Sequence, residues 1–145
     1  MTASQPEFYE QLEQRRPGLS ARLRAFVDSV ADLVITTDFP ASLVLRWLAS
    51  PEVEGRAGFV EKTGRTYFQS GAATAKRAGR PEVGERYLQS IADAVGGSIR
   101  RYERAPPEVV GADGRAIDLT VILDHAQAWR ESLAELIEGL RVPDE

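Results

Sequence analysis

The sequence predicts an α+β fold, in which a small antiparallel sheet (a three-strand meander plus one further strand) is packed by about three amphipathic helices. Three separate segments carry apolar residues at three- and four-residue steps, which is typical of helices. Between them, short runs of β-branched and aromatic residues are bounded by glycine and proline, which is typical of strands. Of the 145 residues, 43% are hydrophobic and 28% are charged. We therefore expect residues 1–145 to form a single domain, with the element order α-α-β-β-β-α-β-α.

The N-terminal segment predicts a short helix. Ser4, Pro6 and Glu7 form a helix start, because serine can accept a hydrogen bond from an amide three residues on and proline suits the first turn. The sequence RRPG at 15–18 ends this helix. Whether residues 1–17 pack on the domain or form a detached helix stays open. A detached helix would offer an apolar contact surface, made of Phe8, Tyr9 and Leu12.

A second helix is predicted over 19–33, where apolar residues form one stripe. These residues are Leu19, Leu23, Phe26, Val27, Val30 and Leu33. A strand follows over 42–49, and the sequence PEVEG at 51–55 predicts a turn. Two short strand-like runs then flank Thr63 and Gly64, where glycine can supply the positive φ of a tight hairpin. These three strands make the predicted meander.

The stretch RTYFQSGAATAKRAGRPEVG at 65–84 is interpreted as the connection from the third strand to a helix. Within it, AATAKRAG predicts either a short helical turn or a loop. Pro81 suits the first position of the next helix, which we expect over 81–95, and Gly96 with Gly97 supplies its stop. The buried stripe of that helix is expected to contain Val83, Tyr87, Leu88, Ile91 and Val95.

The C-terminal third predicts one strand and one long helix. SIRRYE at 98–103 is interpreted as a fourth strand at a sheet edge, because it is charged on both faces and runs into two prolines. Residues 108–117 are expected to form a loop or a weak hairpin. Apolar spacing predicts a helix over 124–141, with Asp124 and Gln127 as its cap.

The composition excludes several classes of site. The chain has no cysteine, so it cannot form disulfides, thiolate metal sites or cysteine nucleophiles. No apolar run resembles a signal peptide or approaches the length that spans a bilayer. We therefore expect a cytoplasmic protein without membrane contact.

Nucleotide-binding motifs do not fit the chain. In GAATAKRAG, Ala75 and Arg77 flank Lys76, whereas a phosphate-binding loop needs glycine before its lysine and a hydroxyl residue after it. The dinucleotide fingerprint GxGxxG is also missing from the sequence. We expect no cofactor.

Catalytic motifs are equally weak. A nuclease-type metal site needs an acid two positions before its lysine, but Val60 takes that position relative to Lys62. The only histidine, His125, is expected in the first turn of a helix rather than in a triad. A magnesium-dependent carboxylate enzyme is therefore the least favoured alternative.

The aromatic residues divide into two groups. Trp47 and Trp129 lie in phase with leucines and are expected in the core. Tyr67 and Phe68 are consecutive, so one of them should face outward from a strand. Together with Tyr102, they are the candidates for an exposed aromatic side chain.

Charge is distributed unevenly along the chain. Residues 56–104 carry ten basic and five acidic side chains, although the whole chain has a net charge of −4. Within this basic segment, 65–104 holds six candidate residues for contact with nucleic acid or another anion. They are Arg65, Lys76, Arg77, Arg80, Arg100 and Arg101. The alternative is a solvated surface on which these cations pair with neighbouring acids such as Glu82, Glu85 and Glu103.

The most favoured hypothesis is a non-catalytic interaction or accessory module that uses charge-complementary surfaces to contact a protein partner or a second copy. The acidic segment 105–145, with three basic and nine acidic side chains, complements the basic one. A domain that contacts nucleic acid through 65–104 is the alternative. The chain's pI of about 5.2 makes it less favoured.

Overall fold

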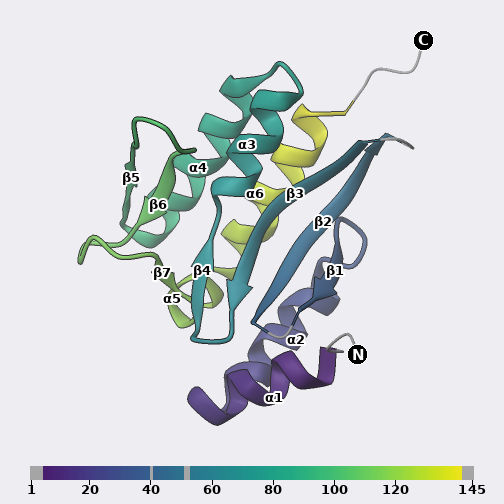
Figure 1. Cartoon of the computed structure of the whole chain (residues 1–145), viewed down its shortest axis with the longest axis vertical. Coiled ribbons are helices and arrows are strands. Elements are labelled where there is room, and N and C mark those ends of the chain that lie inside the picture. The colour runs from purple at the N-terminus through teal and green to yellow at the C-terminus, as the bar shows by residue number, and fades with distance from the viewer. Residues whose placement is uncertain (1–4, 40, 51–52, 142–145) are drawn as a thin grey trace.

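A computed structural model of the chain describes residues 5–39, 41–50 and 53–141 (Figure 1). It is an α+β structure, which confirms the predicted fold class. The described residues form a five-stranded antiparallel sheet in the order β1-β2-β3-β4-β7, a two-stranded β5-β6 hairpin and six helices. The predicted Ser4 cap and residues 51–52 of the predicted 51–55 turn lie outside the described residues. The rest of that predicted turn, residues 53–55, belongs instead to strand β3.

The sheet is built from strands that follow one another closely in sequence. Its strands are β1 (Ile35–Asp38), β2 (Ser42–Ser50), β3 (Val53–Glu61), β4 (Arg65–Tyr67) and β7 (Ile117–Asp118). Strands β2, β3 and β4 form the predicted meander, and Gly64 has a φ of 92° in the turn between β3 and β4. The separate hairpin consists of β5 (Ser98–Arg100) and β6 (Glu108–Val110).

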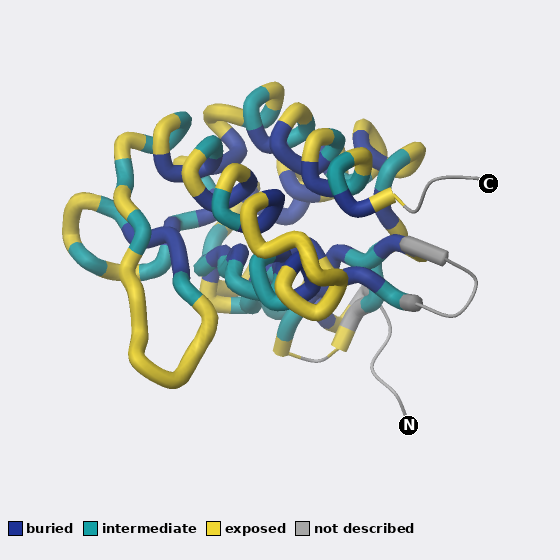
Figure 2. Tube along the Cα trace, turned by 90° about the horizontal axis from the view of Figure 1, so that it is seen from above, coloured by how far each residue is buried: buried dark blue, intermediate teal, exposed yellow. Residues whose placement is uncertain are grey.

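The helices begin and end largely where the sequence indicates. They are α1 (Gln5–Arg15), α2 (Leu19–Ser29), α3 (Gln69–Arg77), α4 (Pro81–Val95), α5 (Leu119–Leu123) and α6 (Ala126–Gly139). Helix α4 has Pro81 in its first turn, and Gly96 ends it in the left-handed conformation at φ 69°. Helices and sheet enclose the core, and residues on their facing sides are buried (Figure 2).

A β-bulge in β3 provides a polar contact between the sheet and α4. Leu45 pairs with Gly58 and Arg46 with Arg56, so that Ala57 of β3 has no opposite residue. Its carbonyl instead accepts a hydrogen bond of 2.8 Å from the buried Tyr87 hydroxyl of α4. The bulge thus ties the sheet to the helical layer by a polar contact as well as by apolar packing.

Helix α1 packs on the domain and is not detached. Phe8, Tyr9 and Leu12 are buried, and they belong to the same apolar cluster as residues of α4 and α6. Arg16, just after α1, also forms a two-pronged ion pair with Asp118, both distances being 2.9 Å. The apolar face of α1 is therefore unavailable as a contact surface.

Several details differ from the sequence-based prediction. Strand β7 is the fifth strand of the main sheet and α5 is a separate short helix, and neither is in the predicted element order. Strand β1 was not predicted. AATAKRAG at 72–79, expected as a short helical turn or a loop, lies mostly in the longer helix α3, which ends at Arg77. Strand β5 pairs with β6 in the hairpin instead of forming an edge of the main sheet. Asp124 follows α5 as its C-cap, and α6 begins after His125 without a side-chain cap.

The two tryptophans are buried, as predicted, with Trp129 stacked on Phe26 at 4.0 Å between ring centroids. No helix within the described part of the chain has both the length and the apolar character needed to cross a membrane.

Candidate functional site

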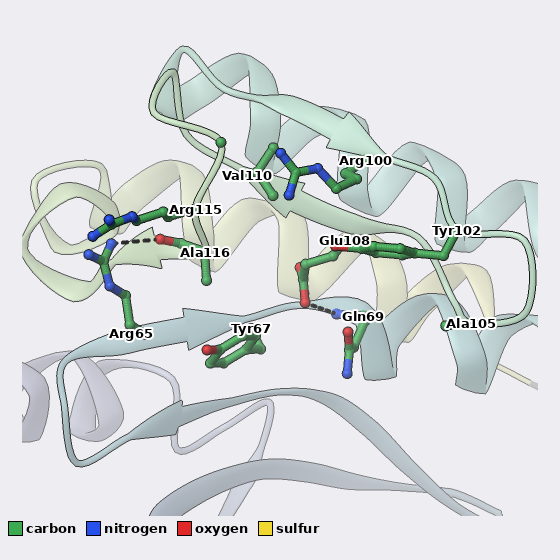
Figure 3. A pocket seen from close by; sticks show the side chains of 11 residues that line it. Arg65, Tyr67, Gln69, Arg100, Tyr102, Ala105, Glu108, Val110, Arg115 and Ala116 are labelled. Carbon is green, nitrogen blue, oxygen red and sulfur yellow. Dashed lines mark hydrogen bonds between the residues drawn. The ribbon is translucent and has the colours of Figure 1, made fainter.

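A pocket of about 520 Å³ lies where β4 and the start of α3 face the β5-β6 hairpin (Figure 3). Such a volume lies within the range of sites that hold a small-molecule ligand. Its lining residues are Arg65, Tyr67, Gln69, Arg100, Tyr102, Ala105, Glu108, Val110, Gly114, Arg115 and Ala116. We call it the arginine pocket, after Arg65, Arg100 and Arg115.

Arg65 lies on the wall formed by β4. Residues alternate in direction along the strand, so Thr66 points into the protein and is fully buried while Arg65 and Tyr67 share the pocket side. One guanidinium nitrogen of Arg65 donates a hydrogen bond of 2.8 Å to the carbonyl of Ala116. This bond fixes the side chain and leaves most of its N–H donors available.

Arg100 and Arg115 come from the opposite wall. Arg100 ends β5, and its Nη2 lies against Gly114, where a Cβ would approach it to 2.9 Å. Gly114 has a φ of 79°, so glycine serves both the turn and the close approach of Arg100. Within the described residues, neither Arg100 nor Arg115 has a side-chain hydrogen bond or ion pair with an acid. Both are exposed.

Glu108 lies between the two walls and is only 4% exposed. Its carboxylate accepts hydrogen bonds from the backbone N–H groups of Phe68, Gln69 and Val109, at 2.7 to 3.2 Å. Burial raises the pKa of Glu108, and these three hydrogen bonds oppose the rise. The carboxylate thus occupies the N-terminal end of α3 and fastens β6 to it.

Two tyrosines supply the aromatic part of the pocket. Tyr67 stacks on Phe59 of the neighbouring strand at 4.9 Å between ring centroids. Burial, followed by a hydrogen bond with Glu61, raises the pKa of the Tyr67 hydroxyl. Phe68 is fully buried, so Tyr67 is the outward member of this pair, as the strand pattern predicts. Tyr102 is 47% exposed at the pocket rim.

The six cationic residues that the sequence indicates as candidates for anion contact do not lie on one surface of the structure. Arg65 and Arg100 line the pocket together. Lys76 and Arg77 lie in the last turn of α3, at the end away from the pocket, with Arg80 just beyond. Arg80 donates to the carbonyl of Gly139.

Arg101 forms a surface ion pair with an acid, which the sequence indicates as the alternative to contact with an anion. It binds Glu85 with two hydrogen bonds, of 2.6 and 2.9 Å. The pair holds the pKa of the Glu85 carboxyl below its ordinary value, chiefly through the hydrogen bond from Arg101.

Sequence reasoning missed Arg115 and Glu108 as pocket residues. Arg115 lies outside the basic segment, in a stretch whose charged residues are mostly acidic. A count of basic and acidic residues along the sequence therefore does not identify it as a candidate. Glu108 directly precedes Val109 and Val110, and a carboxylate at the start of such an apolar run is the only local signal of its burial.

The arrangement provides cationic N–H donors and aromatic surface in a concave site, which is the chemistry of anion binding. Among the described residues, no three histidine, aspartate or glutamate side chains are grouped as metal ligands would be. His125 lies exposed at the start of α6. No protein-family model, no curated protein and no solved structure matches the chain.

Proposed function

We propose that this chain is a non-catalytic interaction module that docks an acidic segment of a protein partner in the arginine pocket. The observation that supports this proposal is the convergence of three arginines that have no acidic partner within the described structure. They come from β4, β5 and the turn before β7, so the fold brings them together from distant positions in the sequence.

The pocket arginines differ from the other arginines in that they are unpaired with acids within the described residues and also line one pocket together. Six arginines outside it also have no ion pair with an acid among the described residues, but no two of them line the same described pocket; they are Arg15, Arg24, Arg77, Arg80, Arg86 and Arg104. Seven arginines elsewhere in the described residues form ion pairs with carboxylates, and those contacts neutralise their charge within the chain; they are Arg16, Arg22, Arg46, Arg56, Arg101, Arg130 and Arg141. The arginine pocket instead keeps its positive charge available. Such charge attracts an acidic partner and fixes the orientation in which it docks.

A peptide-binding experiment tests the proposal. A fluorescein-labelled glutamate-rich peptide is titrated with the protein at low ionic strength, and binding is followed by fluorescence anisotropy. We expect the double variant Arg100→Gln/Arg115→Gln to bind at least about tenfold more weakly, because two charge-assisted contacts are lost. The matched control is Lys76→Gln/Arg77→Gln, which removes the same charge at the far end of α3. Equal weakening in both variants, or no binding by the wild type, would contradict the proposal.

A domain that contacts nucleic acid is the second candidate, and the two tyrosines favour it. Tyr67 and Tyr102 lie beside the arginines, and bases stack on such rings while arginine binds the backbone phosphates. A labelled single-stranded DNA oligonucleotide is therefore titrated with the protein in a parallel experiment. Steeply salt-dependent binding that Arg100→Gln/Arg115→Gln abolishes, without binding of the acidic peptide, would favour this candidate.

The partner could also be a second copy, since the described part of α6 carries three exposed acids: Glu131, Glu135 and Glu138. Light scattering across a concentration series separates this case from a different partner. A mass that stays at 15.9 kDa at high concentration would exclude self-association.

A further inference from the structure

We infer that the group held in the arginine pocket is a phosphate monoester on a side chain of the protein partner, so that the module distinguishes phosphorylated from unmodified segments. This inference rests on the proposed function and deepens it. The observations that support it are the number of guanidinium groups, the hydrogen bond that holds one of them, and the position of Glu108.

The charge of the pocket suits a dianion. Three guanidinium groups and one carboxylate, Glu108, line it, so cationic groups outnumber anionic ones. None of the three guanidinium groups is paired with an acid within the described residues. A single glutamate or aspartate side chain of a partner brings one negative charge and two oxygens. A phosphorylated side chain brings a charge of about −1.5 to −2 and three acceptor oxygens, which three arginines can share.

One of the arginines, Arg65, is held by a hydrogen bond before any ligand arrives. The carbonyl of Ala116 holds Arg65 at 2.8 Å, and the bare backbone of Gly114 provides the surface on which Arg100 lies. Side chains that are already ordered lose less conformational entropy when they bind. Planar guanidinium groups in fixed positions match the oxygens of a phosphate better than mobile lysines do.

Glu108 occupies the N-terminal end of α3 and adds a carboxylate to the pocket lining, so an anion can bind only at the arginines. Its carboxylate is bonded to the first backbone N–H groups of α3, which would otherwise attract an anion themselves. The helix end is therefore occupied from within the chain, and the arginine donors remain for the ligand. The pocket volume of about 520 Å³ accommodates a phosphorylated side chain with part of its flanking backbone.

The test uses three peptide libraries that have random flanking residues and differ only at a fixed central position, which is phosphoserine, glutamate or serine. Each library competes with the labelled glutamate-rich peptide for the wild-type protein. We expect the phosphoserine library to compete at least about tenfold better than the glutamate library, and the serine library not to compete. Equal competition by phosphoserine and glutamate would overturn this inference but leave the proposed function standing. No binding of any acidic peptide would overturn both.

Further competitors identify the source of the phosphate. Inorganic phosphate should compete only weakly, because it lacks the flanking peptide contacts. Competition by inorganic phosphate equal to that of the phosphoserine library would contradict a protein partner and indicate a free anion. Competition by single-stranded DNA alone would indicate a nucleic-acid ligand instead.

Two variants test the roles of the arginine geometry. Arg100→Lys keeps the charge but removes the planar fork, so it should reduce the preference for phosphoserine over glutamate by severalfold. Gly114→Ala brings a Cβ to within 2.9 Å of Arg100 Nη2, which can shift, and strains the backbone at φ 79°, so it should lower the melting temperature and change the preference less than Arg100→Lys does. Circular dichroism melting of both variants verifies that they fold. An unchanged preference in the folded Arg100→Lys protein would contradict the inference.

Discussion

At the scale of single residues, two carboxylates show how the same functional group is used in opposite ways. Glu108 is almost fully buried, and burial raises its pKa. In Asp118, burial also acts to raise the pKa, but hydrogen bonds from Arg16 and Thr120 outweigh it and lower the pKa to about 2. The first residue fastens the hairpin to α3, and the second fastens the segment after α1 to the start of α5.

Removal of the Glu108 carboxylate should destabilise the fold. Glu108→Ala leaves the buried N–H groups of Phe68 and Val109 without their acceptor, which costs about 1 to 3 kcal/mol of unfolding free energy. Urea unfolding followed by circular dichroism measures the loss. Glu103→Ala is the control, because its side chain is exposed on the β5-β6 loop and should change stability by less than about 0.5 kcal/mol. Equal stability of the two variants would show that the Glu108 contacts do not form.

The pH dependence of Glu108 has a definite sign. Since its pKa is raised in the folded state, folding is most favourable while Glu108 is protonated, and its contribution falls as the pH rises above the ordinary value of 4.5. Wild-type protein should therefore lose unfolding free energy relative to Glu108→Gln between about pH 4.5 and neutrality. Thermal melts of both proteins over this range measure the difference. A difference that grows in favour of the wild type with rising pH would contradict the raised pKa.

The stabilising contribution of Asp118 should depend on pH in the opposite direction to that of Glu108. Because its folded pKa lies near 2, below the ordinary value of 3.8, its stabilising contribution is complete above about pH 4 and disappears as the pH falls toward 2. Asp118→Asn should cost about 1 to 2 kcal/mol at neutral pH and make unfolding less sensitive to acid. Asp124→Asn breaks the more exposed Arg22 pair and should cost less than about 0.5 kcal/mol. Identical acid unfolding of Asp118→Asn and wild type would refute this role.

At the scale of elements, long segments with a clear pattern were predictable and short ones were not. The stripes of α2, α4 and α6 and the β2-β3-β4 meander follow from spacing and turn residues. Strand β1 has four residues and β6 has three, which is too few for an alternation of apolar and polar residues to be recognised in the sequence. Helix α3 is rich in small residues and carries no large apolar stripe, so only its packing against α4 reveals why it is helical.

The contact between α3 and α4 depends on Gly84. A Cβ at this position would lie 2.8 Å from Ala72 Cα and 2.9 Å from Ala75 Cβ, closer than real contacts allow. Gly84→Ala should therefore destabilise the protein by about 1 to 3 kcal/mol, although alanine favours a helix by about 1 kcal/mol over glycine. Urea unfolding measures the change, with Arg86→Ala on the exposed side of α4 as the control. A gain in stability would mean that the two helices pack less closely.

At the scale of the whole molecule, the basic middle segment is not one surface. The fold places Lys76 and Arg77 in the last turn of α3, with Arg80 just beyond, and brings Arg65 and Arg100 together near the other end of that helix. It adds Arg115, which belongs to an otherwise acidic stretch. Counting charges along the sequence could indicate that cations matter, but only long-range packing decides which of them share a site.

The net charge of the chain also bears on where an anion can bind. With −4 overall, the protein as a whole does not attract anions, so binding of an acidic peptide requires a local concentration of positive charge. The affinity should therefore fall as salt is added, since added ions screen the exposed arginines. Anisotropy titrations at several salt concentrations measure this dependence. Salt-independent binding would point to an apolar contact instead.

The most direct measurement is a two-dimensional ¹H–¹⁵N NMR titration of the full chain with the glutamate-rich and phosphoserine peptides. We predict saturable shifts of the backbone amides of Arg65, Gln69, Arg100, Tyr102 and Arg115, with the amides of Lys76 and Arg77 unchanged. Shifts confined to the α3-α4 turn or to α6, or no shifts in the presence of either peptide, would contradict a binding site in the arginine pocket.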